Sequence, residues 1–226
     1  MAEQAVKTVI FDMDGVIFDT ERVYIECCIE AAKEMPVPEE QVYETCVKCT
    51  GTNEFQTMEF FYRDFADYLT ETEIRILRDE SVRIFRKRYA EKLIPMKTGV
   101  VELLEYLKEQ GIRIGLASST RKDIVESELA GAGILHYFES VTGGDVVKIS
   151  KPNPEIYLIA CDKMRVTPQE CFAIEDSFNG IRAAKAAGMR PVMVPDLIQP
   201  TDEIRQMAET VCSDLFGVMD YLRSLQ

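Results

Sequence analysis

Two pairs of acidic residues are the first candidates for chemistry in this sequence. Asp12 and Asp14 follow an apolar, β-branched run and are two residues apart, so on an extended segment they point to the same side. Two like charges this close need a cation or a shifted pKa. Glu175 and Asp176 close a second apolar run, at residues 171–174. Because all of these side chains offer oxygen, Mg²⁺ is the cation that they favour.

Two serines and one lysine are further candidates. Ser118 and Ser119 come after residues 112–117, where hydroxyls and the N–H groups of a helix start suit an anion. Lys151 lies in a segment stiffened by Pro152 and Pro154 and suits a phosphoryl group. Taken singly, these features are also typical of a solvated turn, a helix N-cap, a surface lysine or acids that complement a helix dipole. Together they favour phosphoryl transfer by positioning and charge neutralisation.

The elements that must position these residues alternate between strands and helices after about residue 93. Repeated βα units predict a parallel sheet with helices on both faces, and ligands bind such sheets beyond the carboxyl ends of the strands. We therefore expect Asp12, Asp14 and Asp176 to converge around a divalent ion, with Lys151 close by. The predicted strands are 6–12, 112–117, a short one near 141, 171–174, 191–194 and 210–212, and the predicted helices are 99–109, 121–130, 154–161, 177–187, 202–208 and 215–222.

The block between the first strand and the remaining strands is predicted to be helical. Apolar residues recur at helical spacing from Thr20, the predicted N-cap, toward Pro36, the predicted stop. Similar patterns cover residues 42–46, 55–65 and 74–89. The expected fold class is α/β, a doubly wound, Rossmann-like parallel sheet core with an inserted all-helical cap domain. The core would comprise residues 1–18 and 93–226, and the cap residues 19–92.

Composition narrows the classes of partner. The chain has 226 residues, and 26 Lys and Arg against 39 Asp and Glu give a formal net charge of −13, which disfavours nucleic acid and anionic membranes. No apolar run approaches the ~18 residues of a membrane span, and the N-terminus lacks a signal-peptide pattern. We therefore expect a soluble, cytoplasmic protein whose seven cysteines are free thiols. The sequence indicates no obligate protein partner.

Other features have weaker chemical interpretations. A single histidine, His136, gives little support to a Ser–His triad or a His-rich metal site. Cys46 and Cys49 form a CxxC that could be a zinc or redox site, but they and the Cys27–Cys28 pair are better explained as small buried hydrophobic residues. No nucleotide-binding glycine loop is present in the sequence.

At this point the motifs resemble, in chain order, those of the haloacid dehalogenase (HAD) superfamily. The matching residues are DMDGV at 12–16, Ser118, KP at 151–152 and EDS at 175–177. The longer segments DMDGVIFDTE (12–21), KPxP (151–154) and EDSxxGI (175–181) are similar to its β-phosphoglucomutase-like phosphatase branch. That branch has a helical cap where this chain has its inserted block. The resemblance covers essentially the whole chain.

The resemblance implies a role for each motif residue. Asp12 would attack phosphorus to give an aspartyl-phosphate, and Asp14 would protonate the leaving oxygen and then deprotonate the hydrolytic water. The Mg²⁺ ligands implied are Asp12, Asp14 through its backbone carbonyl, Asp176 and, with it, Glu175. The phosphoryl-binding residues implied are Ser118, Ser119 and Lys151.

The implied function is a Mg²⁺-dependent phosphatase that hydrolyses small phosphorylated metabolites, with sugar phosphates expected. Two alternatives stay open. The first is a β-phosphoglucomutase-type hexose-phosphate mutase, which would use the same intermediate. The second is a non-catalytic signalling domain in which Asp12 only accepts a phosphoryl group, as in response-regulator receivers, although these have no helical insertion.

The cap residues favour the hydrolase over the mutase. β-Phosphoglucomutases carry a cap histidine and a cap arginine where counting places Tyr24 and Glu54 in this chain. A carboxylate in place of the guanidinium removes a phosphate clamp. We expect Glu21, Tyr24, Asn53 and Glu54 to set the substrate, and segments near Gly51 and at 93–96 to act as hinges for cap closure.

Overall fold

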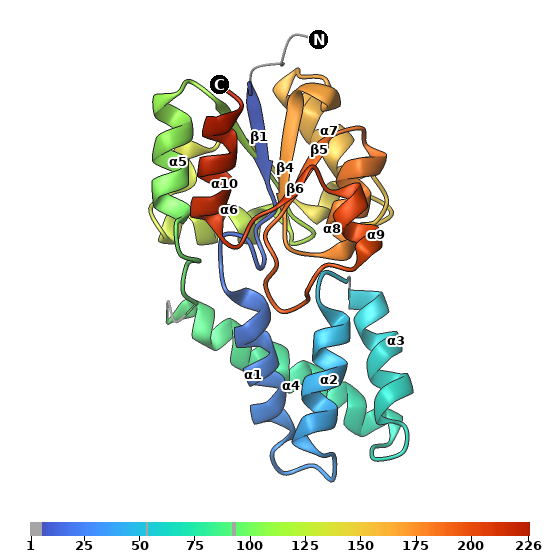
Figure 1. The fold of residues 1–226 in the computed structure, drawn as a ribbon. Coiled ribbons are helices and arrows are strands. Elements are labelled where there is room, and N and C mark those ends of the chain that lie inside the picture. Colours follow the sequence, from blue (N-terminus) through green and yellow to red (C-terminus); the bar gives the residue numbers. More distant parts are fainter. Residues whose placement is uncertain (1–5, 53, 92–93) are drawn as a thin grey trace. The chain divides into compact units, whose positions relative to one another are not determined.

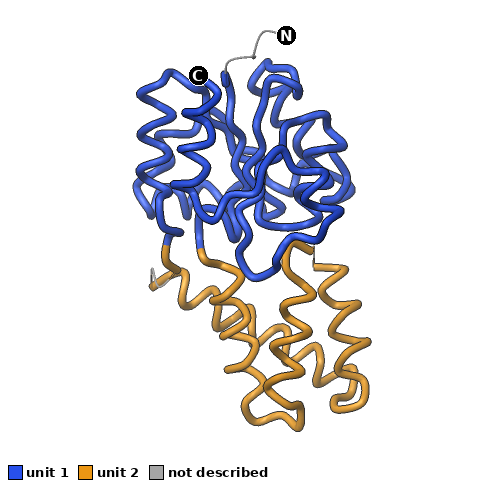
Figure 2. The backbone as a smooth tube through the Cα atoms, in the orientation of Figure 1, with its two compact units in different colours: residues 1–18, 96–226 blue, residues 19–95 orange. Residues whose placement is uncertain are grey.

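The structure, a computed structural model, describes residues 6–52, 54–91 and 94–226 of the chain. It divides into two compact units (Figure 2). The first unit comprises Met1–Phe18 and Met96–Gln226, and the second comprises Asp19–Pro95. The second unit is therefore inserted into the first directly after the first strand.

The first unit is built on a six-stranded parallel sheet with the strand order β3-β2-β1-β4-β5-β6 (Figure 1). The predicted α/β fold is thus confirmed. The central strand β1 pairs with β2 on one side and β4 on the other, and all four of its residues are buried, which explains why its sequence is apolar without alternation. The strands are β1 Thr8–Phe11, β2 Arg113–Ala117, β3 Ser140–Thr142, β4 Cys171–Glu175, β5 Arg190–Met193 and β6 Thr210–Val211.

Helices cover both faces of this sheet, as Figure 1 shows. Alternate residues of β4 point to opposite faces. The Phe172 ring lies 6.2 Å from the Tyr221 ring of α10, whereas Ala173 packs in the cluster formed with α7 and α8. The helices of this unit are α5 Val100–Glu109, α6 Lys122–Gly131, α7 Glu155–Met164, α8 Phe178–Ala186, α9 Asp202–Met207 and α10 Leu215–Ser224, and the 3-10 turns are η1 Leu135–Tyr137, η2 Gly144–Val146 and η3 Pro168–Glu170.

The second unit contains only helices among its described residues, which are α1 Thr20–Ala32, α2 Glu39–Cys49, α3 Glu54–Phe65 and α4 Glu71–Ala90. The predicted N-cap of α1 was one residue too late, whereas the helix ends before the predicted stop. Asp19 occupies the N-cap position and Thr20 is the first helical residue, while the helix ends at Ala32, ahead of Pro36. The best-defined start belongs to α4, where Thr70 and Glu73 form a reciprocal capping box.

All seven cysteines are free and buried. Those of α1 and α2 lie on the buried sides of their helices, among apolar neighbours. This placement favours the interpretation of the CxxC as part of the hydrophobic core.

The chain leaves and re-enters the first unit through two antiparallel segments. Phe18 forms an isolated antiparallel bridge with Met96, and the Lys97 N–H donates to the Ile17 carbonyl at 2.8 Å. Leu93, at the start of the predicted second hinge, lies outside the described residues. Gly51, in the other predicted hinge, has a left-handed φ of 69°. Cap closure about these segments stays a prediction.

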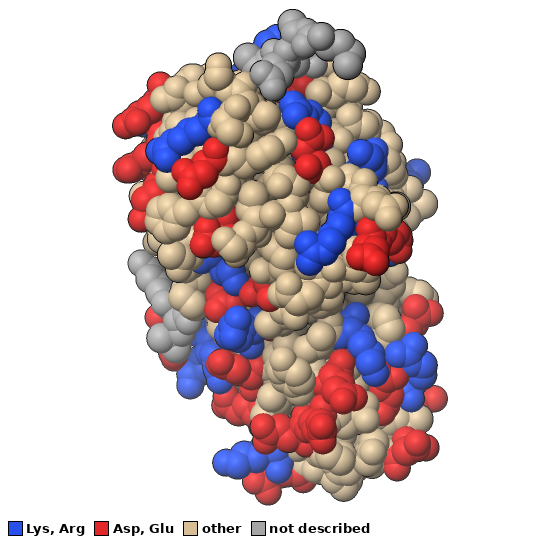
Figure 3. All heavy atoms as spheres, in the orientation of Figure 1, with Lys and Arg blue, Asp and Glu red and all other residues tan. Residues whose placement is uncertain are grey.

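The surface drawn in Figure 3 carries acidic side chains on both units, with Lys and Arg interspersed among them. Some of these charges are paired, as in the 3.0 Å contact between Arg182 and Glu203. Within the described part of the chain, no helix combines the length and the apolar character that crossing a membrane requires.

Candidate active site

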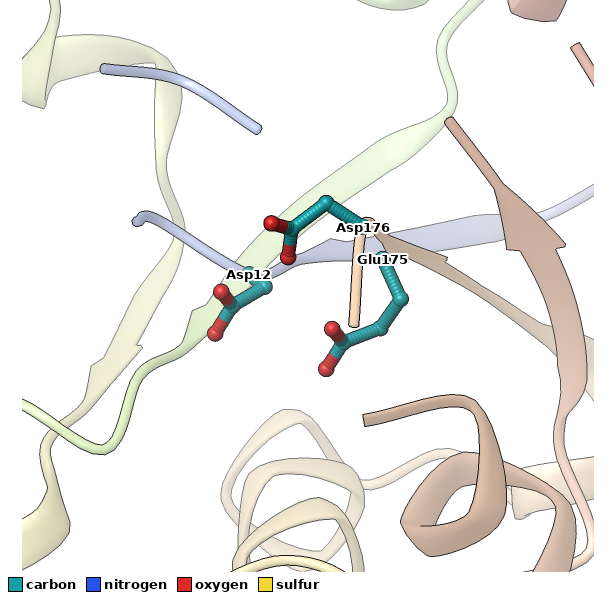
Figure 4. A group of neighbouring side chains, drawn as sticks. All are labelled: Asp12, Glu175 and Asp176. Atoms are coloured by element: carbon teal, nitrogen blue, oxygen red, sulfur yellow. The ribbon is translucent and has the colours of Figure 1, made fainter. Parts of the chain in front are cut away.

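Three buried carboxyl groups meet at the carboxyl ends of two neighbouring strands. Asp12 follows β1, and Glu175 and Asp176 lie at the end of β4, with one oxygen from each within 4.8 Å of the others (Figure 4). The backbone explains this convergence. Strands β1 and β4 are paired in parallel register, and the Asp12 N–H continues the ladder by donating to the Ile174 carbonyl at 3.0 Å.

Lys151 is the cation of this cluster. Its Nζ lies 2.6 Å from Asp12 Oδ1 and 2.7 Å from Glu175 Oε1, and it also donates to the Ala117 carbonyl at 3.2 Å. The side chain is only 4% exposed. Acceptors from three different strand ends thus surround the ammonium group, which fixes the lysine beside the first acid.

Tyr157, on α7, contacts both Glu175 and Lys151. Its hydroxyl donates to Glu175 Oε1, and its ring lies 5.0 Å from Lys151 Nζ. Ser177 Oγ lies 3.4 Å from the other oxygen of Glu175. Sequence reasoning missed Tyr157, because it falls on the apolar face of a predicted helix and nothing in its spacing distinguishes it from a core aromatic residue.

The charges in this cluster do not balance. Burial is the strongest influence on the pKa of Asp12 and raises it to about 8, against the opposing effect of Lys151. Burial alone would lower the pKa of Lys151, but Asp12 and Glu175 outweigh it and raise this pKa. Three buried carboxyls therefore surround one buried ammonium. A divalent cation held by Asp12, Glu175 and Asp176 would restore the balance and favour ionised Asp12, and oxygen ligands of this kind fit Mg²⁺.

Gly15 allows the acids to approach. Its φ is 78°, in the left-handed region, and a Cβ atom at this position would lie 2.1 Å from Asp176 Oδ2. Any side chain there would push the Asp176 carboxylate away from Asp12. The glycine after the second aspartate of the motif is thus required both for the turn and for the close contact.

Asp14 is not one of the three acids whose oxygens meet, although its charge contributes to raising the pKa of Asp12. The half-buried side chain of Asp14 turns toward the end of β2, where Oδ2 accepts a 2.9 Å hydrogen bond from Thr120 Oγ1 and lies 3.4 Å from Ser118 Oγ. We expected Asp14 to converge on the ion site, but the group of carboxylates that could hold an ion does not include its side chain. The metal contact expected of its backbone carbonyl stays a prediction. Thr120 was not among the predicted site residues.

The two serines of this segment differ. Ser118 is buried, and its Oγ accepts the Thr120 N–H at 3.0 Å, which leaves the hydroxyl proton available for donation. Ser119 is exposed. Of the two predicted phosphoryl-binding serines, Ser118 thus lies beside Asp14 at the strand end, and Ser119 points its side chain to the surface.

The predicted cap residues lie in the second unit. Glu21 accepts the Gly51 N–H at 3.1 Å, and the Tyr24 ring packs edge-on against Phe85 at 5.6 Å. Asn53 lies outside the described residues.

Glu54 is paired with an arginine that the sequence did not point to. Its carboxylate lies 2.6 Å from Arg78 of α4, and the charge of this arginine also opposes the rise in the pKa of Tyr24 that burial causes. A guanidinium group therefore lies near both Tyr24 and Glu54, although it comes from a different helix than the one counted from the motif. Glu54 replaces the arginine expected at its own position, but Arg78 supplies a basic group beside it.

Comparison with known proteins places these features in a family. The family described as "Haloacid dehalogenase-like hydrolase" matches this chain over residues 9–194. YhcW of Bacillus subtilis (strain 168) is 36% identical over 231 residues, which cover 97% of this chain and 99% of that protein. The "Phosphorylated carbohydrates phosphatase" of Thermotoga maritima is 32% identical over 82% of this chain and 83% of its own length.

A solved structure is similar over nearly the same extent. CbbY from Rhodobacter sphaeroides, crystallised as a variant in complex with xylulose 1,5-bisphosphate, superposes with a TM-score of 0.72 at 25% identity. The match covers 93% of this chain and 95% of that one. Both the sheet and the helical insertion are therefore common to the two proteins.

Proposed function

Because the chain belongs to the haloacid dehalogenase-like hydrolase family, we propose that it is a Mg²⁺-dependent phosphatase that hydrolyses small phosphorylated carbohydrates through an aspartyl-phosphate. The observation that carries the proposal is the buried cluster in which Lys151 bridges Asp12 and Glu175 beside Asp176. The substrate class is supported by the name of the Thermotoga maritima relative and by the sugar bisphosphate bound to CbbY.

Asp12 is the nucleophile in this proposal. One of its carboxylate oxygens attacks phosphorus while the bond from phosphorus to the leaving oxygen breaks, and Asp14 gives its proton to that oxygen. In the second step Asp14, now a carboxylate, takes a proton from water as the water oxygen bonds to phosphorus. The bond between Asp12 and phosphorus then breaks, which releases inorganic phosphate and restores both residues.

Lys151 and Ser118 hold the phosphoryl group in line for this attack. The ammonium already lies 2.6 Å from the nucleophile, and the Ser118 hydroxyl would donate to a phosphoryl oxygen in place of its 3.4 Å contact with Asp14 Oδ2. A Mg²⁺ ion held by Asp12, Asp176 and Glu175 would supply further neutralisation of the charge on the phosphoryl oxygens. We also propose that residues 19–95 act as a cap that selects the substrate.

A phosphate-release assay over a panel of sugar phosphates, with Mg²⁺ and with EDTA, tests the proposal. We expect Mg²⁺-dependent release from at least one sugar monophosphate, with turnover. Absence of release from every member of the panel, together with absence of an acid-stable phosphorylated enzyme, would refute it. A long-lived phosphorylated protein without turnover would instead identify the phospho-acceptor signalling domain.

The hexose-phosphate mutase is the second candidate, favoured by one observation. Arg78 supplies the cap with a guanidinium group beside Glu54, which could hold a second phosphate. Incubation with β-glucose 1-phosphate and Mg²⁺ separates the two activities. Conversion to glucose 6-phosphate with little free phosphate would identify the mutase, and release of phosphate and glucose would identify the phosphatase.

A further inference from the structure

We propose that Thr120 is a positioning residue that holds the carboxyl group of Asp14 for proton transfer to the leaving group. This inference rests on the proposed function, in which Asp14 is the general acid and base. Thr120 lies just beyond β2, outside the four motifs, and is half-buried. It makes hydrogen bonds to two of the proposed site residues at once.

The first of these bonds comes from the side chain. Thr120 Oγ1 donates to Asp14 Oδ2 at 2.9 Å, which is a good distance for a hydroxyl and a carboxylate. The second comes from the backbone, where the Thr120 N–H donates to Ser118 Oγ at 3.0 Å. One residue thus fixes both the proposed acid and the proposed phosphoryl-binding hydroxyl.

The bonds also distinguish the two oxygens of Asp14. Within the described part of the chain, both hydrogen bonds to this carboxyl group, from Thr120 and from Ser118, fall on Oδ2. These two donors thus hold Oδ2 and leave Oδ1 for the proton transfer. Thr120 therefore aims the group: Oδ1 gives its proton to the leaving oxygen as the phosphorus–oxygen bond breaks, and later takes a proton from the attacking water.

The backbone of Thr120 is held in place by the segment after β3. The Gly144 N–H donates to the Thr120 carbonyl at 2.8 Å, and the Lys122 N–H donates to Asp145 Oδ1 at 2.7 Å. A Cβ atom on Gly144 would lie 2.1 Å from the Ser119 carbonyl oxygen, so the two segments touch directly. Thr120 is consequently fixed on both sides by residues of the same unit, as a residue that orients another side chain must be.

The proposal predicts a dependence on the leaving group. An alcohol leaves as a strongly basic alkoxide unless it is protonated, whereas p-nitrophenolate leaves readily without a proton. Loss of the Thr120 hydroxyl should therefore slow hydrolysis of alkyl phosphates and spare hydrolysis of an aryl phosphate. A hydroxyl that only stabilised the fold would affect both substrates equally.

The experiment compares Thr120→Val, Thr120→Ser and the parent with p-nitrophenyl phosphate and with the best alkyl substrate of the sugar-phosphate panel. For Thr120→Val we expect kcat on the alkyl substrate to fall about 10- to 100-fold. We expect its KM, and its kcat on the aryl substrate, to change by less than about threefold. Thr120→Ser keeps the hydroxyl and should stay within about threefold of the parent on both substrates.

Thr167→Val is the matched control. The Thr167 hydroxyl also donates to a carboxylate, Glu170 Oε2 at 2.7 Å, but before the amino end of β4, whereas the site lies at the carboxyl ends of the strands, so its loss should leave both rates unchanged. If Thr120→Val does not fold, Thr120→Ala is measured in the same way, since it removes the hydroxyl with a smaller side chain.

The outcomes separate this inference from the proposed function. A parent protein that hydrolyses neither substrate refutes the proposed function itself. An active parent whose Thr120→Val or Thr120→Ala variant loses the same factor on both substrates, or loses nothing, overturns only the role of Thr120. Failure of Thr120→Ser to restore alkyl hydrolysis would also overturn it.

Discussion

The two units of this protein keep their candidate functional residues in different environments. In the first unit, Asp12 is 7% exposed, Glu175 is fully buried and Lys151 joins them. In the second unit, the carboxylate side chain of Glu54 is 74% exposed and its partner Arg78 is 22% exposed. The first unit therefore holds its charges in a low-dielectric environment with fixed partners, and the second holds them in contact with water.

This difference has energetic consequences. A buried ion pair that loses one partner leaves an uncompensated charge, which costs several kcal/mol, whereas an exposed pair contributes about 0–1 kcal/mol. Residues of the first unit are thus hard to exchange, and residues around Arg78 are easy to exchange. We infer that substitutions in the first unit lower the rate for every substrate, and that substitutions in the second unit change which substrates are preferred. The predictions below test this contrast.

The largest effect is expected for Asp12→Asn. The substitution keeps the shape of the side chain but removes the nucleophilic oxygen, so kcat on every substrate, aryl or alkyl, should fall by at least about 10³-fold. Phosphate release measures the loss, and phosphorylated enzyme should no longer form. Asp220→Asn, an exposed aspartate on α10 paired with Arg223, is the control and should keep the parent rate. Residual activity within about tenfold of the parent would contradict the assignment.

The second prediction concerns Lys151→Met, a change that preserves length and removes the charge. The buried carboxyl groups of Asp12 and Glu175 lose the ammonium group that they share, and no other cation replaces it in EDTA. We expect urea unfolding in EDTA to show a loss of about 3–5 kcal/mol at neutral pH. Activity should fall on all substrates alike, because the same group holds the phosphoryl oxygens.

Lys185→Met provides the comparison for that experiment. Lys185 is exposed on α8 and its substitution should change the free energy of unfolding by less than about 0.5 kcal/mol. If Lys151→Met were as stable as the parent, the buried ion pairs of the first unit would contribute no more to stability than exposed pairs, and the contrast between the two units would be wrong.

The same contrast explains what the sequence could predict. Strand ends in a parallel sheet converge by topology, so Asp12, Glu175 and Asp176 could be placed together from their positions after apolar runs. Their register follows from the ladder between β1 and β4. The fold class followed in the same way, from the alternation of strand and helix patterns. Lys151 lies in the segment before α7 and was recognised instead from the prolines that follow it.

Side-chain partners on helices and in loops could not be predicted in this way. The contact of Arg78 with Glu54 joins two cap helices whose packing no local pattern specifies. Tyr157 looks like any apolar helix residue, and Thr120 looks like part of a turn. The turn of Asp14 toward Thr120 depends on side-chain rotation after the strand has ended, for which the sequence carries no periodic signal.

A third prediction links Mg²⁺ to pH through Asp12. Burial raises the pKa of this carboxyl from 3.8 to about 8, so in EDTA the folded protein binds a proton that the unfolded chain releases. Stability in EDTA should therefore fall as pH rises from about 4 to about 8. Mg²⁺ competes with that proton, so Mg²⁺ should increase the free energy of unfolding more near pH 8 than near pH 5. At a Mg²⁺ concentration 100 times its dissociation constant, the increase should be about 2.7 kcal/mol.

Urea unfolding with Mg²⁺ and with EDTA at several pH values measures this linkage. Asp12→Asn is the control, because an amide does not titrate and its pH slope in EDTA should flatten. The same Mg²⁺ increment at every pH would show that the ion binds elsewhere or that Asp12 is already ionised without it.

The smallest effects are expected in the second unit, and their signs make them informative. Glu54→Gln removes the nearer of two carboxylates beside the Arg78 guanidinium, the other being Asp79 at 3.7 Å, so a sugar bisphosphate should bind more tightly. Arg78→Met leaves Glu54 to repel the second phosphate, so the bisphosphate should bind more weakly. We expect KM changes of up to about tenfold in opposite directions, with less than about threefold change in kcat on p-nitrophenyl phosphate and less than about 1 kcal/mol in stability. KM for a bisphosphate and for the matching monophosphate, measured for both variants, separates charge from general disturbance of the cap. Changes in the same direction, or an equal loss with the aryl substrate, would mean that these helices support the reaction itself. In that case the inference that the first unit carries the reaction and the second selects the substrate would be wrong.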